Sequence, residues 1–192
     1  MAIQLQNSTF IHIPKTGGIW AKECLERYAE ITSNHDWKGA HLTPDIDDKG
    51  VFLFVRKPCD WLGSLFSHRK HKSWNWDDRN ELELRCKSDN FDEFIDNVCR
   101  NEGVVEEYFN QYIRKYEINN DLQIGRHENL CNDLIKILYY FNERFDKKGM
   151  KRMAPKKRNK SAKKYGFRLK LTEDQKNKVY FSQKSFYNKY YE

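Results

Sequence analysis

A stretch near the amino terminus, HIPKTGG at residues 12–18, combines the groups that bind anions. A lysine and a threonine stand next to a pair of glycines, whose backbone N–H groups are able to approach an anion closely. An apolar-periodic segment follows, so the stretch predicts a loop that joins a strand to the N-terminus of a helix. The residues of this loop and helix start that we expect to bind an anion are Lys15, Thr16, Gly17, Gly18, Ile19 and Trp20.

A second stretch with the same character follows the apolar run VFLFV at residues 51–55. Arg56 ends this run, and Ser64 comes eight residues later, in a segment with helical spacing. A guanidinium and a hydroxyl at this separation are able to converge on one anion. Because ligands of parallel α/β sheets bind beyond the carboxyl ends of the strands, both anion sites should lie at the same edge of a sheet.

The order of residues in the first loop differs from that of a Walker A motif. In GxxxxGK[ST] the lysine follows the glycines, whereas Lys15 precedes Gly17 and Gly18. The second run ends on Arg56, where a metal-dependent NTPase would have an acidic residue for magnesium. Both features disfavour an ATPase, although a nucleotide or sugar kinase stays an alternative.

These loops must be held by a sheet and its helices. The pattern of apolar residues predicts strands at 9–13, 51–55 and 122–125, and helices at 19–31, 61–71, 77–87, 91–99, 104–116, 130–145 and from Thr172 onward. Strands that alternate with helices indicate an α/β fold with a central, mainly parallel sheet. The length of 192 residues suits a single domain over residues 1–192.

The composition indicates a folded protein. The 28 aromatic side chains are too many for a disordered chain. The sequence has no apolar run of membrane-spanning length and does not begin like a signal peptide, so we expect a cytoplasmic protein without membrane contact. Its five cysteines are scattered and form no CxxC pair, which predicts reduced packing residues and neither zinc nor disulfides.

Basic residues are concentrated in one segment. Residues 147–170 contain twelve Lys or Arg and no Asp or Glu, whereas the rest of the chain has more acidic than basic side chains. Few large apolar residues occur there, so we expect a loop or lid. Such a segment implies a polyanionic partner. A nucleic-acid-binding module that uses residues 147–170 is therefore a second interpretation of the chain.

The ordered set of motifs resembles a known family. HIPKTGG is similar to the 5′-phosphosulfate loop of sulfotransferases that use 3′-phosphoadenylyl sulfate (PAPS), and FVRKPCDWLGS resembles their 3′-phosphate motif, RxPxxxxxS. GAHLTP around His41, NFDEFI, IGRHENL and LTEDQKNKVY follow in the order of small carbohydrate-type members. The resemblance covers nearly the whole chain. It implies a three-layer P-loop NTPase-like fold.

The resemblance also implies a reaction. A sulfuryl group would pass from PAPS to an acceptor hydroxyl, of a glycan or a small metabolite, with PAP as the product and without a metal. Attack in line with the departing group places negative charge on the bridging oxygen, which Lys15 would stabilise. His41 would accept the proton of the hydroxyl. Nucleic acid is then an unlikely partner. Family members often have Thr where this chain has Ile19.

Other positions are assigned to substrate and nucleotide. Within the basic segment, the residues expected to contact phosphate are Arg158, Asn159, Lys160 and Ser161. His68 is expected to contact the acceptor. Trp74 and Trp76 could stack on sugar faces or pack in the core, two roles that the sequence leaves open. We expect Glu128 to brace the site or the core, and His12 to be structural.

Overall fold

The computed structural model describes residues 2–35, 49–71, 80–117, 121–153 and 170–192. The chain divides into two compact units, each built from two separate segments. Unit 1 contains Met1–Arg56 and Tyr112–Arg158, and unit 2 contains Lys57–Gln111 and Asn159–Glu192. The expectation of one domain over residues 1–192 stays a prediction.

Unit 1 is built on a five-stranded sheet. Its strands are β1 (Ala2–Leu5), β2 (Ser8–Ile11), β3 (Ile31–His35), β4 (Gly50–Val55) and β5 (Leu122–Arg126), in the order β3-β1-β2-β4-β5. β2, β4 and β5 are parallel neighbours, whereas β1 is antiparallel to both β2 and β3. Four strands therefore run in one direction. This mixed, mostly parallel sheet confirms the predicted α/β class.

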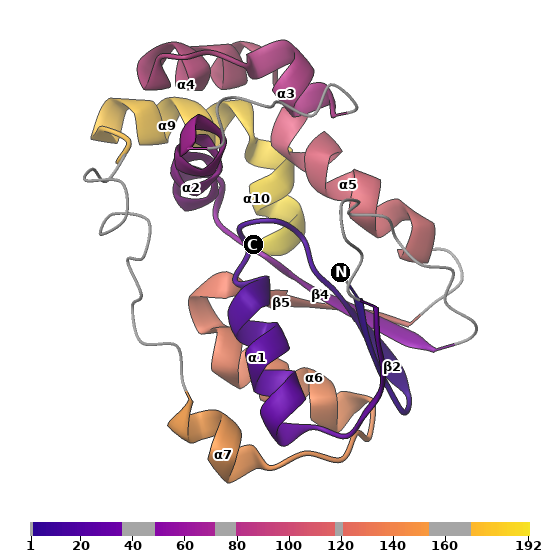
Figure 1. The fold of residues 1–192 in the computed structure, drawn as a ribbon. Helices are drawn as coiled ribbons and strands as arrows, with labels where there is room; N and C mark the ends of the chain where they lie inside the picture. Colours follow the sequence, from indigo (N-terminus) through magenta and orange to yellow (C-terminus); the bar gives the residue numbers. More distant parts are fainter. Residues whose placement is uncertain (1, 36–48, 72–79, 118–120, 154–169) are drawn as a thin grey trace. The chain divides into compact units, whose positions relative to one another are not determined.

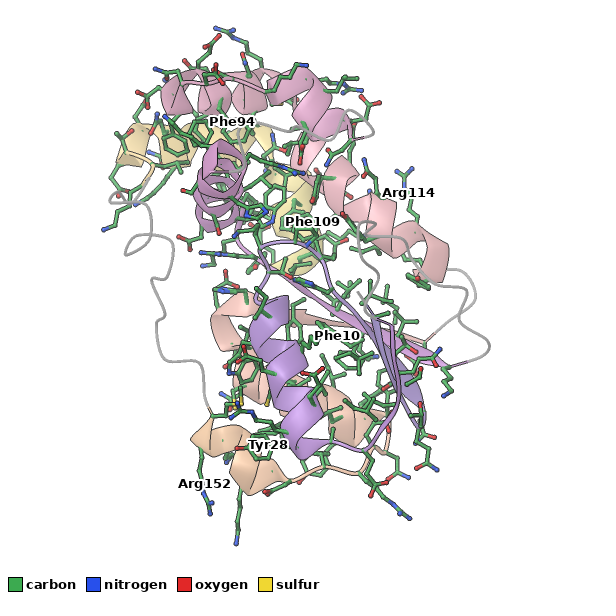
Figure 2. The ribbon with its side chains drawn as sticks, viewed as in Figure 1. Phe10, Tyr28, Phe94, Phe109, Arg114 and Arg152 are labelled. Atoms are coloured by element: carbon green, nitrogen blue, oxygen red, sulfur yellow. The ribbon has the colours of Figure 1, made fainter. Side chains whose placement is uncertain are left out.

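Two helices of unit 1 pack against one face of this sheet, and a third packs on those two helices (Figure 1). They are α1 (Gly18–Tyr28), α6 (Leu130–Tyr140) and α7 (Lys147–Arg152). Phe10, labelled in Figure 2, contacts Phe52 of the adjacent strand with 5.4 Å between the ring centroids, and both rings are fully buried. The strands are short, so these aromatic side chains supply much of the apolar area that holds the sheet to its helices.

Unit 2 is helical in the part of the chain that the structure describes. Its helices are α2 (Pro58–His71), α3 (Glu81–Cys86), α4 (Phe91–Arg100), α5 (Val104–Glu117), α9 (Glu173–Ser182) and α10 (Lys184–Tyr190); the last residues of α5 belong to unit 1. Trp61 is buried against Tyr108 and Phe109, at centroid distances of 4.7 and 5.1 Å. Among the described residues, no helix is long and apolar enough to cross a membrane.

A buried amide ties the helices of unit 2 together. Gln183, at the junction of α9 and α10, is fully buried. Its side-chain oxygen accepts a hydrogen bond from the backbone of Val105, and its nitrogen donates to the carbonyls of Val98 and Asn101. A buried amide costs free energy unless it is bonded in this way. Gln183 therefore holds the α4–α5 corner and the C-terminal helices in one arrangement.

Several predicted boundaries were wrong. The predicted helix 19–31 ends at Tyr28, because Ile31 begins β3 on the far side of β1. The strand β1 was not predicted, nor was the separate helix α10. Local patterns missed these elements because they are short and are stabilised by distant partners. The predicted capping box of α9 is confirmed: the Thr172 side chain and the Gln175 side chain bond each other's backbone N–H groups.

The basic segment was predicted to be a loop or lid. Its first residues instead form helix α7. The carboxylate of Asp146 caps this helix and accepts hydrogen bonds from the backbone N–H groups of Lys148 and Gly149. Met150 is buried in the core of unit 1. The Asp146 cap and the burial of Met150 together explain why this charged stretch is helical. The predicted loop or lid from residue 154 to residue 169 lies outside the described residues.

Candidate anion-binding site

The two predicted anion-binding loops follow parallel strands of unit 1. β2 is parallel to β4, and β4 is parallel to β5, so the carboxyl ends of all three lie at one edge of the sheet. The HIPKTGG loop follows β2, Arg56 follows β4, and His127 follows β5. This edge is where α/β sheets bind ligands. We call the HIPKTGG loop, Arg56 and His127 together the carboxyl edge of unit 1.

The backbone of the first loop is left-handed at two residues. Lys15 has φ of 68° and Gly17 has φ of 93°. A side chain at Gly17 would also have no space, because its Cβ would lie 2.6 Å from Cδ1 of Leu130. A non-glycine residue at positive φ is uncommon and marks a backbone held by its surroundings. The loop thus has a fixed shape that requires glycine at position 17.

The second glycine is required by a close contact. A Cβ at Gly18 would lie 1.7 Å from Cδ2 of His12, so the imidazole packs directly against the start of α1. This ring also stacks on Phe10, with 6.4 Å between centroids. His12 is half-buried. Its ring therefore sets how closely the helix start approaches β2.

The hydroxyl of Thr16 is used inside the loop. Thr16 is buried, and its Oγ1 donates a hydrogen bond of 2.8 Å to the carbonyl of Ile13. A hydroxyl has one proton to donate. In this conformation Thr16 closes the turn, and the group that it offers an anion is its backbone rather than its side chain.

The first turn of α1 provides backbone N–H donors at the end of the loop. The helix begins at Gly18 and has no acidic residue in its first turn, so the positive end of its dipole is not neutralised there. Ile19 is 65% exposed, and its side chain contributes no hydrogen-bonding group. Trp20 points elsewhere: its indole N–H donates a 2.8 Å hydrogen bond to the carbonyl of Met153. Trp20 thereby ties Met153, the last described residue before position 154, to the start of α1.

Arg56 joins the second predicted loop to the first. Its Nη1 donates a 3.3 Å hydrogen bond to the backbone carbonyl of Lys15, and the side chain is half-buried. The guanidinium at the end of β4 therefore reaches the loop after β2. Two cationic residues, Lys15 and Arg56, are brought together from positions 41 residues apart in the sequence.

The structure adds a residue that the sequence interpretation did not single out. His127 begins the short 3-10 helix His127–Asn129 and is half-buried, with its Cδ2 at 3.0 Å from the place of a Cβ on Gly17. IGRHENL was noted as a motif, and the available signal was that His127 comes two residues after the predicted strand 122–125. Glu128, expected to brace the site or the core, is exposed in the same 3-10 helix.

The remaining predicted residues belong to unit 2 or lie outside the described residues. Ser64 and His68 are half-buried, one turn apart on α2 of unit 2, so the convergence of Ser64 with Arg56 stays a prediction. Seven other predicted residues lie outside the described residues: His41, Trp74, Trp76, Arg158, Asn159, Lys160 and Ser161.

Metal-binding side chains do not gather in the described part of the chain, where no group of three His, Cys, Asp or Glu residues could hold an ion. All five cysteines are free thiols, and Cys24 and Cys86 are buried. In comparisons with known proteins, no family model matches the chain and no curated protein matches it.

Proposed function

We propose that this protein is a PAPS-dependent sulfotransferase that transfers a sulfuryl group to a hydroxyl of a glycan or a small metabolite. The observation that carries the proposal is the meeting of Lys15 and Arg56 at the ends of two parallel strands. PAPS has an anion at each end of its nucleotide, and each predicted cradle contributes one cation to this edge. The strand, glycine loop and helix sequence further supports a P-loop NTPase-like arrangement in three layers.

The 5′ end of the nucleotide would be bound by the first loop. Gly17 and Gly18 let Leu130 and His12 pack closely against the loop backbone, and the N–H groups in the first turn of a helix, which lack intrahelical partners, bind anions. PAPS supplies the activated sulfuryl group. We expect the ammonium of Lys15 to stabilise negative charge on the bridging oxygen as that bond breaks. Thr16 would hold the loop closed, and Ile19 would contribute its backbone only.

The 3′-phosphate would be bound by Arg56, with the hydroxyl of Ser64 as its expected companion. The hydrogen bond from Trp20 to Met153 supports a role for the basic segment, because it holds Met153, a residue of that segment, to the first turn of α1. From there, Arg158, Asn159, Lys160 and Ser161 would contact the nucleotide phosphates.

The roles that we propose for residues on the acceptor side of the reaction rest on the sequence. His41 would take the proton of the attacking hydroxyl, because a neutral imidazole is a suitable base near neutral pH. His68, Trp74 and Trp76 would contact the acceptor. If His41 is the base, His41→Ala should lower turnover far more than it lowers PAP affinity. Unchanged turnover in this variant would remove the assignment.

The proposal is tested by thermal denaturation with two nucleotides. PAP without metal should raise the melting temperature, because a ligand that binds only the folded state stabilises it. ATP with magnesium should have little effect, since the chain lacks the Walker A order and the acidic strand end. Stabilisation by ATP with magnesium but not by PAP would instead support a nucleotide or sugar kinase. Stabilisation by neither nucleotide would contradict both enzyme assignments.

A further inference from the structure

His127 occupies the same position on β5 that Arg56 occupies on β4. The two strands are parallel, and their last paired residues are Val55 and Arg126. The next residue of each strand is therefore the first one beyond the sheet: Arg56 on β4 and His127 on β5. The two side chains leave the sheet at the same edge, and Arg56 is already in contact with the glycine loop.

The imidazole of His127 lies directly against the glycine loop. Its Cδ2 is 3.0 Å from the place of a Cβ on Gly17, and Leu130 packs on the same glycine. Gly17 is the N-cap of α1, so this ring stands beside the backbone N–H groups that begin the helix. A ligand anion that binds those N–H groups would come within reach of the ring.

The chain on both sides of His127 is fixed by one carboxylate. Asp133 Oδ2 accepts a 2.8 Å hydrogen bond from the backbone N–H of Arg126, and Oδ1 accepts one of 2.7 Å from the side chain of Asn129. Leu130, one turn into this corner, is buried. The backbone on both sides of His127 is thus held in place, as is needed for a residue that binds a ligand with defined geometry.

We infer that His127 is a further donor-binding residue, which donates an imidazole N–H to the anion held by the HIPKTGG loop. The inference rests on the proposed function, and it assigns His127 to the 5′ end of the nucleotide rather than to the acceptor. A neutral imidazole still carries one N–H donor. It would complement Lys15, which binds as a point charge, with a directional hydrogen bond.

The test compares PAP with adenosine 3′-phosphate, which differs from PAP only at the 5′ end, and adds inorganic pyrophosphate as a probe without the nucleoside. Binding of PAP, adenosine 3′-phosphate and inorganic pyrophosphate is measured by calorimetry for the wild type, His127→Leu and His127→Gln. Leucine keeps apolar packing against Gly17 but removes the donor, whereas glutamine restores an N–H group. We expect His127→Leu to weaken PAP binding about 10-fold or more, the usual effect of losing a hydrogen bond to a charged group, and to leave adenosine 3′-phosphate unchanged. His127→Gln should recover part of the loss.

Each result decides the inference. Equal PAP affinity in the wild type and His127→Leu would overturn it and leave the proposed function intact. An equal loss for PAP and adenosine 3′-phosphate would also overturn it, because the effect would not be specific to the 5′ end. If the wild type does not bind PAP, the proposed function fails. In that case pyrophosphate decides: weaker binding in His127→Leu supports the inference, and equal or absent binding overturns it.

Discussion

The interior of unit 2 and the carboxyl edge of unit 1 use polar side chains in opposite ways. In unit 2, the fully buried carboxylate of Glu83 is paired with Arg69, and the buried amide of Gln183 bonds three backbone groups. At the carboxyl edge, Lys15 and His127 are only half-buried and stand at the ends of strands. The first arrangement fixes helices to one another, whereas the second keeps polar groups within reach of a ligand.

This difference separates stability from chemistry. A buried polar group that is fully bonded makes its unit depend on that bond, so its loss should lower the free energy of unfolding. A half-exposed group at a strand end contributes little to the core, so its loss should change binding and leave the fold. Each of the following predictions tests one side of this contrast.

The largest effect is expected from Arg69→Ala in unit 2. The change leaves the carboxylate of Glu83 buried without its guanidinium, which should lower the free energy of unfolding by about 3–5 kcal/mol. Chemical denaturation measures this. The matched control is Arg85→Ala, whose ion pairs with Glu81 and Glu107 are exposed and should contribute no more than about 1 kcal/mol. Equal losses in the two variants would remove the distinction between buried and exposed pairs.

At the carboxyl edge, Lys15→Ala should lower turnover strongly and leave stability nearly unchanged. Losing the group that stabilises the departing oxygen should lower turnover by about 100- to 1,000-fold, as for the loss of one oxyanion-stabilising group elsewhere. The melting temperature should stay close to that of the wild type, since Lys15 is half-buried in a loop. Lys136→Ala, an exposed change on α6, serves as the control. A strong loss of stability in Lys15→Ala would show that its role is structural.

A smaller effect, common to both units, comes from two buried thiols. Burial raises the pKa of Cys24 in α1 and of Cys86 in α3 to about 12, above the ordinary value of a thiol. The neutral thiol favours the folded state, so its contribution is fully present below about pH 8.5. It is then lost as the pH rises toward 12, at up to about 1.4 kcal/mol per pH unit for each thiol.

The measurement is the unfolding free energy at several alkaline pH values for the wild type, Cys24→Ala and Cys86→Ala. Each variant should lose stability less steeply with pH than the wild type does, because one of the two thiols no longer titrates. The two slopes should change by similar amounts, since both thiols are fully buried. Parallel curves for wild type and variant would contradict the assignment for that thiol.

The smallest effect is expected from Ile19→Thr. Ile19 is 65% exposed, so threonine should cost little stability. Its hydroxyl would add a donor at the first turn of α1, worth about 1 kcal/mol, or roughly fivefold tighter PAP binding. Calorimetry with PAP measures this gain. Unchanged affinity would place the 5′ end of the nucleotide away from Ile19.

Much of the fold was readable from local patterns. The run VFLFV predicted β4, which the structure places at Gly50–Val55. The capping box predicted the start of α9 at the correct residue. Elements that depend on distant partners were missed. β3, for example, follows α1 after a short turn and is paired with β1, at the end of the described sheet. The start of the basic segment folds as α7 because Met150 is buried in the core of unit 1.

The sequence by itself determined which groups could bind an anion. Lys15 with two glycines, and Arg56 after a buried strand, are types and spacings that need no tertiary knowledge. Only the tertiary structure decided which of them meet. Parallel pairing of β2, β4 and β5 brought Arg56 to Lys15 and His127 to Gly17, and the hydroxyl of Thr16 turned inward. The reason is physical: spacing fixes neighbours along a strand or helix, whereas contacts between strand ends depend on the order of strands in the sheet.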